Sequence, residues 1–148
     1  MKYHKLIAFS ILILIFPVFV VSCGDDDEEQ ADPKAAKITL LTAGSSKTWV
    51  LNSHKDEGVE VTEECERDDE WIFTFDGAFT VDYNTKCSPD QVGTVSGSWK
   101  LNDDATAIII TDTDTETEFT LIELTETTLR VSFKIEDTIP AELGFTAK

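Results

Sequence analysis

The sequence predicts an all-β fold, a small barrel of about eight antiparallel strands that follows a cleaved signal and an acidic tether. Two observations carry this prediction. Short runs of alternating apolar and polar residues recur from about residue 47 onward, and turn residues separate them. Such alternation places the apolar side chains of a strand on one face. The spacing leaves no room for βαβ crossovers, and closing the strands into a barrel removes the exposed edges of a flat sheet.

The first 22 residues have the pattern of a cleaved signal peptide. Lys2 and Lys5 form a positively charged start, and residues 6–21 are an uncharged, almost wholly apolar run. Pro17 interrupts this run, whose sixteen residues are fewer than the roughly 20 that a spanning helix needs. We therefore expect residues 1–22 to be removed rather than to stay as a transmembrane helix.

The end of the signal resembles the lipobox of bacterial lipoproteins. Val20, Val21 and Ser22 precede Cys23, as apolar and small residues precede the lipid-bearing cysteine in such signals. The resemblance implies that Cys23 begins the mature chain and carries a diacyl or triacyl anchor that includes palmitate. More than one acyl chain gives a stable hold on a membrane. The alternative is an ordinary secretory signal with a chance cysteine at its end.

Five acidic residues, 25–29, follow the cysteine directly. They resemble the acidic export signal of some Gram-negative lipoproteins, which implies display on the exterior face of the cell outer membrane. As a run of like charges they are also expected to form a solvated, disordered spacer. Residues 23–37 are then a flexible tether, and residues 38–148 form one domain that is large enough to bury a core.

The composition excludes some partners. The chain has 29 acidic residues against 12 basic ones, and its net charge is −17. Nucleic acid or an anionic lipid surface would require a basic patch, so neither is an expected partner. We expect a monomer without a cofactor, held at the membrane through the lipid on Cys23 and able to take up a small hydrophobic ligand.

The two other cysteines predict a disulfide. Once Cys23 carries the lipid, Cys65 and Cys87 are left as a pair in an oxidising compartment. A bridge that closes a loop of about 23 residues contributes roughly 3 kcal/mol in the chain-entropy model. Free thiols or a metal site are the alternatives. Neither cysteine has a histidine or a second cysteine at ligand spacing, so no metal site is expected.

The clearest single element is a hairpin around Asp76-Gly77. Residues 71–75 and 78–83 alternate on either side of it, and Asp-Gly suits a type I′ turn, which needs positive φ. Further strands are expected at residues 47–51, 59–62, 95–101, 107–110, 117–121, 129–135 and 143–146, with a short helix at residues 38–43.

Several of these segments carry a resemblance to a family. Lys47-Thr48-Trp49, the segment from Cys65 to Cys87, and Gly97-Ser98-Trp99 are similar to the lipocalin-like domain of small Gram-negative bacterial lipoproteins. The resemblance implies an eight-stranded up-and-down barrel. Barrels of this strand number are either filled by side chains or hold one small ligand.

Inward-facing aromatic side chains are the candidate ligand-binding residues. Alternation places them inside the barrel, where they either pack the core of a small domain or line a pocket. The candidates are Trp49, Phe73, Phe75, Phe79, Trp99, Phe119 and Phe133.

Two groups of acids are expected to be solvated. Asp112, Asp114, Glu116 and Glu118 recur at every second residue, and a hairpin turn near residues 113–115 would spread them in water. No glycine supports a calcium loop there. The run Asp68-Asp69-Glu70 is a weak candidate for binding a cation.

Nothing in the sequence indicates catalysis. His54 has no free cysteine to activate, and neither a Gly-x-Ser-x-Gly motif nor a phosphate loop is present. Two hypotheses follow. The first is a tethered protein that binds a small apolar or amphipathic molecule. The second is a structural or accessory envelope lipoprotein with a solidly packed barrel, which acts through protein or glycan contacts.

Overall fold

The structure, a computed structural model, describes residues 32–135 and 138–148. The predicted signal, Cys23 and the acidic run 25–29 lie outside the described residues. Within the described ranges, no helix is long and apolar enough to cross a membrane.

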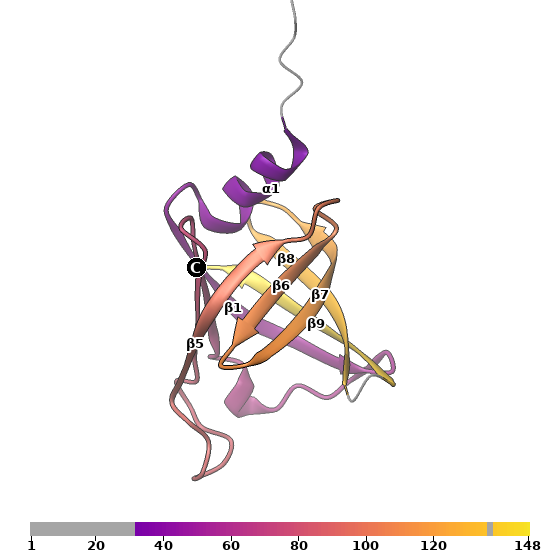
Figure 1. Cartoon of the computed structure of the whole chain (residues 1–148). Coiled ribbons are helices and arrows are strands. Elements are labelled where there is room, and N and C mark those ends of the chain that lie inside the picture. Colours follow the sequence, from indigo (N-terminus) through magenta and orange to yellow (C-terminus); the bar gives the residue numbers. More distant parts are fainter. Residues whose placement is uncertain (1–31, 136–137) are drawn as a thin grey trace, which may run out of the picture. The chain divides into compact units, whose positions relative to one another are not determined.

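The described chain forms a closed antiparallel barrel of eight strands, with one short helix at an end (Figure 1). From β3 (Glu70–Thr74) to β9 (Ile139–Ala147) each strand pairs with the next one, and β1 (Ser46–Asp56) pairs with both β3 and β9, which closes the barrel. The two-residue strand β2 (Val59–Glu60) pairs only with Lys55 and Asp56 at the end of β1 and is not one of the eight barrel strands. The predicted up-and-down barrel is therefore confirmed. The elements are α1 (Pro33–Thr42), β1 (Ser46–Asp56), β2 (Val59–Glu60), the 3-10 helix η1 (Glu64–Glu66), β3 (Glu70–Thr74), β4 (Ala78–Asp82), β5 (Thr94–Leu101), β6 (Ala107–Asp112), β7 (Thr115–Leu124), β8 (Thr128–Ile135) and β9 (Ile139–Ala147).

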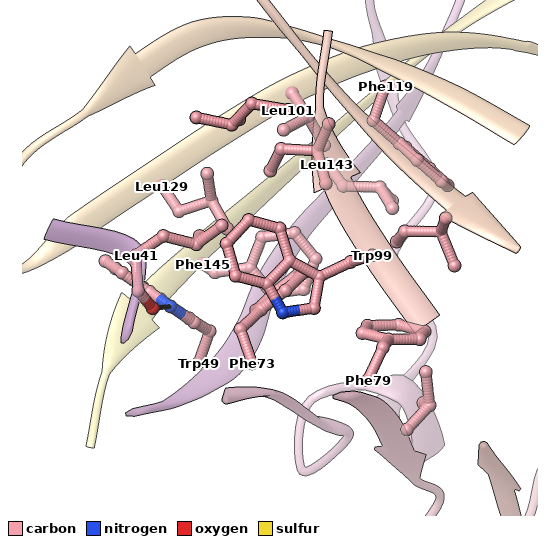
Figure 2. Packing of buried hydrophobic residues seen from close by; sticks show 14 of the residues in the cluster. Leu41, Trp49, Phe73, Phe79, Trp99, Leu101, Phe119, Leu129, Leu143 and Phe145 are labelled. Atoms are coloured by element: carbon pink, nitrogen blue, oxygen red, sulfur yellow. Dashed lines mark hydrogen bonds between the residues drawn. The ribbon is translucent and has the colours of Figure 1, made fainter. Parts of the chain in front are cut away.

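Aromatic and aliphatic side chains fill most of the barrel interior. Figure 2 shows the ring of Trp99 among those of Phe73, Phe79 and Phe145, with Leu41 at the side where α1 enters. Phe73 contacts Phe79 and Trp99 with ring centroids 5.1 and 5.6 Å apart. The core is therefore continuous across the barrel axis over this part of its length.

Helix α1 closes one end of the barrel. Leu41 is fully buried, and the indole Nε1 of Trp49 donates a 3.0 Å hydrogen bond to its carbonyl oxygen. Lys37 Nζ donates to the carbonyl of Ala105 in the β5–β6 turn at 2.7 Å. Lys47 Nζ reaches both the carbonyl of Leu40 and that of Glu126 in the β7–β8 turn. The helix is thus tied to the strand ends that surround it.

The helix begins earlier than the sequence prediction of residues 38–43. Asp32 is the N-cap, and its side chain accepts a hydrogen bond from the amide of Lys34. Pro33 occupies the first turn, where the N–H that proline lacks would have no partner within the helix. Residues 33–37, assigned to the flexible tether, are therefore helical. The Asp-Pro pair was the signal that could have located this start.

The hairpin at Asp76-Gly77 is confirmed, but its turn differs from the predicted type I′. Strand β3 ends at Thr74, and of the loop residues 75–77 only Gly77 has positive φ, at 90°. The amide of Gly77 donates to the carbonyl of Thr74 at 3.0 Å, as in a three-residue loop with a left-handed glycine. Phe75 consequently leaves the strand alternation and is 60% exposed, so its predicted place inside the barrel is wrong.

Gly97 is expected to tolerate no side chain. A Cβ at this position of β5 would overlap the carbonyl oxygen of Thr111 and lie 3.2 Å from Cα of Asp112 on the neighbouring strand. Backbone atoms cannot yield as a flexible side chain does, so Gly97→Ala should lower the free energy of unfolding by about 1–3 kcal/mol. Urea denaturation checks this. Gly93→Ala is the matched control, because its Cβ would meet only the flexible end of the Lys86 side chain, at 3.6 Å or more; equal losses in both variants would contradict the prediction.

Candidate ligand site at the open end of the barrel

The end of the barrel opposite α1 is not filled. In an up-and-down barrel alternate turns lie at the same end, so the β4–β5 loop and the β6–β7 turn meet at the end away from α1. In Figure 1 α1 lies at the top and the β4–β5 loop at the bottom. A cavity of about 150 Å³ opens there among the inner faces of strands β3 to β7.

The walls of this cavity are apolar and its rim is polar. Trp71, Phe79 and Phe119 form an aromatic wall, in which the Trp71 ring stands edge-on to each phenyl ring at a centroid distance of 5.4 Å. Tyr83 and Asp112 also line the cavity. Asp112 lies on the inner face because it follows Ile110 by two residues on β6.

The predicted aromatic residues separate into three groups. Phe79 and Phe119 line the cavity, and Phe133 packs against Phe119 with ring centroids 5.1 Å apart. The second group is buried in the filled part of the barrel and lines no part of the cavity: Trp49, Phe73 and Trp99. Phe75 is exposed in the β3–β4 turn.

Two cavity-lining aromatic residues were missing from the predicted set. Trp71 shares a face of β3 with Phe73, and Tyr83 continues the face of Phe79 and Val81. The same alternation that selected their neighbours could have found both.

A second hollow lies beside the cavity, where β7 and β8 part. Among the described residues, ladder pairs join the two strands only from Thr120↔Ser132 to Leu124↔Leu129. Beyond Thr120, toward the open end, a cleft of about 530 Å³ separates them. Thr115 and Thr117 line both the cleft and the cavity, so the two spaces adjoin.

Asp69 is a buried acid at this open end. Asp69 is only 5% exposed, and its Oδ1 has no hydrogen-bond partner among the described residues. The ladder pair Glu70↔Asp82, continued by one residue, places Asp69 opposite Tyr83 on the inner face. Burial raises the pKa of Asp69 to about 7, and the nearby charges of Asp68, Glu66 and Asp82 add to the shift.

Tyr83 is affected by the same acids. Burial raises the pKa of its phenol, and the charges of Asp69 and Asp112 raise it further. Tyr83 therefore lies within electrostatic reach of two carboxylates at the mouth of the cavity.

The pH dependence of stability should reveal the buried acid. The pKa of Asp69 rises from 3.8 to about 7 on folding, so the folded state holds the proton more tightly. The contribution of this group is largest below about pH 4, falls as the pH rises to about 7 and is constant above that. Asp69→Asn should therefore gain stability relative to the wild type between pH 4 and pH 8, as measured by urea denaturation at each pH.

The control for this prediction is Asp114→Asn, which removes an exposed acid from the β6–β7 turn. Its stability difference from the wild type should not change over the same pH range. If the stability difference between Asp69→Asn and the wild type is also constant over this pH range, the burial of an ionising carboxyl at Asp69 is contradicted.

The three consecutive acids do not form a cation site. The Asp68 carboxylate accepts hydrogen bonds from the amide and the hydroxyl of Thr85, at 3.2 and 2.6 Å. Glu70 is paired with Lys148 at 2.6 Å, on the other face from Asp69. The expectation that these acids are solvated is therefore wrong for the buried Asp69, and the alternative that the three bind a cation together is wrong as well.

The acids of residues 112–118 are spread by a hairpin, as predicted. Strands β6 and β7 are joined by the two-residue turn of Thr113, whose φ is 50°, and Asp114. Asp112 faces the cavity, whereas Glu116 points outward and pairs with Lys100 at 3.4 Å.

The predicted disulfide is formed. Cys65 in η1 and Cys87 in the β4–β5 loop are bonded across a separation of 22 residues. Glu63 lies near both sulfurs, but bonded sulfurs offer no thiolate to a metal ion. The bridge fastens the long β4–β5 loop to the segment that precedes β3.

His54 is held by two carboxylates. Its Nδ1 lies 3.2 Å from Glu66 Oε1, and its Nε2 lies 3.2 Å from Asp56 Oδ1. The contact of Nδ1 with Glu66 has hydrogen-bond geometry, whereas Nε2 and Asp56 Oδ1 are buried without a hydrogen-bond partner among the described residues.

A short up-and-down barrel that is plugged at one end and hollow at the other is the architecture of the calyx-like barrels, which can hold one small ligand. Residues 46–131 match the family model of the lipocalin-like domain, and the chain belongs to this family. The match runs from β1 into β8. No curated protein and no solved structure matches the chain.

Proposed function

We propose that the protein binds a small apolar or amphipathic molecule in the open end of its barrel. The cavity of about 150 Å³ carries this proposal, because apolar side chains line it although the rest of the interior is packed. A dry cavity of about this size in an engineered protein admits benzene. Pockets for drug-sized ligands have roughly 300–1,000 Å³, so a larger ligand would extend into the adjoining cleft.

A second candidate is a structural or accessory role. The filled half of the barrel supports it, since Trp49 and Phe73 are fully buried and the rings of Phe73, Phe79 and Trp99 meet in the interior. In that case the outer surface contacts another envelope protein or a glycan, and the small cavity stays empty.

Native mass spectrometry of the protein purified from its host distinguishes the two roles. Val95 lines the cavity, whereas Ser96 is the next residue on β5 and points outward. The wild type and Ser96→Phe should retain a small molecule at one per chain, and Val95→Phe should lose it because the new ring occupies the space. A bare mass for the wild type would contradict ligand binding.

The proposal includes a membrane anchor. The apolar run 6–21 and the lipobox-like residues before Cys23 support lipidation of that cysteine, and the acidic run 25–29 supports display outside the cell outer membrane. We also propose that the chain is a monomer that neither catalyses a reaction nor binds nucleic acid or a cofactor.

Metabolic labelling with palmitate tests the anchor. Cys23→Ser should abolish the label, whereas Cys65→Ser should keep it, because Cys65 is not a lipid site. Neutral residues in place of 25–29 should leave the protein labelled but protected from external protease. If the external protease still cleaves this variant as it cleaves the wild type, residues 25–29 serve only as a spacer.

A further inference from the structure

The open end of the barrel combines an aromatic wall with carboxylates. Asp112 lines the cavity together with Trp71, Phe79 and Phe119. No basic side chain is among the described residues that line it; Lys134 lies in the adjoining cleft, with Glu116 and Glu118. The cavity is therefore negatively charged at its rim and apolar within.

Asp69 gives an independent indication that a ligand belongs there. A buried carboxylate oxygen without a donor costs free energy, and native proteins rarely leave one unpaired. Asp69 Oδ1 is such an oxygen among the described residues; Asp69 does not itself line the cavity, but it lies near Tyr83, which does. A donor that enters through the mouth would satisfy it.

We infer that the ligand is a small organic ammonium ion that lies against Trp71 with its charged group at the mouth, where Asp112 lines the cavity and Asp69 is buried near Tyr83. This inference rests on the proposed ligand-binding function and specifies the class of ligand. Aromatic rings attract a cation over their faces, and aromatic walls recur in sites that recognise ammonium groups. The charge-assisted hydrogen bond from an ammonium group to a carboxylate is the stronger kind.

A bare metal ion fits the site less well. Calcium takes six to eight oxygen ligands, and these must converge on one point. Among the described residues, the acids of the mouth form no group of three whose ligand atoms lie within 4.8 Å of one another. An organic cation does not need this convergence, because its polar hydrogens point in several directions.

Isothermal titration calorimetry with matched probes tests the inference, on the full lipidated protein in a maltoside detergent. The probes share a phenyl ring and a short chain: 2-phenylethylammonium is cationic, 2-phenylethanol neutral and 3-phenylpropionate anionic. At pH 8 the wild type should bind the ammonium at least about tenfold more tightly than the alcohol, and should not bind the carboxylate.

Two variants locate the effect. Asp69→Asn should remove the preference for the ammonium over the alcohol while its affinity for the alcohol stays as in the wild type, which shows that the cavity is intact. Asp114→Asn, in the exposed turn, should keep the preference. For the wild type the preference should also fall between pH 8 and pH 5, where Asp69 becomes protonated; the charges of Asp68, Glu66 and Asp82 act on Asp69, and Tyr83 lies near both Asp69 and Asp112.

The outcomes separate this inference from the proposed function. Equal affinity of the wild type for the ammonium and the alcohol would overturn the ammonium inference and leave ligand binding standing. Competition of the ammonium by millimolar calcium, with a matching loss in Asp69→Asn, would replace the organic cation by a metal ion. No binding of any probe, together with a bare native mass, would overturn both proposals.

Discussion

Trp49→Ala is expected to lower the free energy of unfolding by about 3–5 kcal/mol, the largest loss from any single substitution considered. Trp49 is fully buried where α1 meets the barrel, and its indole holds the carbonyl of Leu41. The substitution creates a cavity and also releases the helix that closes this end. Since domains of this size have only about 5–15 kcal/mol in total, the variant should unfold at a much lower urea concentration.

The controls separate volume from hydrogen bonding. Trp49→Phe keeps most of the buried ring but removes the donor to Leu41, so it should lose clearly less than the alanine variant. Phe75→Ala removes an exposed ring from the same end of the barrel and should change stability by less than about 0.5 kcal/mol. A loss below about 1 kcal/mol for Trp49→Ala would contradict the packing described for this residue.

Removal of the disulfide is expected to cost about 3 kcal/mol, the second large effect. The bond between Cys65 and Cys87 spans 22 residues, and without it the unfolded chain regains the freedom of that loop. The double variant Cys65→Ser, Cys87→Ser should therefore show a lower urea midpoint than the oxidised wild type.

Reduction provides the matched control. The wild type measured in dithiothreitol should approach the stability of the double variant, and the double variant should not respond to the reductant. In the native oxidised protein neither Cys65 nor Cys87 should react with iodoacetamide. Alkylation of both would show that the pair is not bonded in the protein as isolated.

Local alternation was sufficient to predict most of the barrel. The strands with a regular apolar face, such as β4 with Phe79 and Val81, lie where the sequence places them. Strand β1 extends five residues beyond the predicted end, to Asp56, although residues 52–56 are all polar. These residues are strand because β9 pairs with them, and a pairing across about 90 residues leaves no local signal.

The candidate site was harder to predict from the sequence, because it too depends on contacts between segments that are far apart in the chain. Asp68, Asp69 and Glu70 are indistinguishable in sequence, yet only Asp69 is buried at the mouth. Thr85 holds Asp68 from the β4–β5 loop, and the final residue, Lys148, holds Glu70. Contacts between distant segments therefore decide which of the three acids is buried.

Between β7 and β8 the described ladder pairs stop at Thr120↔Ser132, next to the cavity. In the described part of the chain, the backbone groups of residues 115–119 that face this gap have no ladder partner on β8, so water competes for them directly. Amide hydrogen exchange should therefore be fastest along this part of β7 in the empty protein. It should slow when a molecule fills the space behind Phe119 and Phe133.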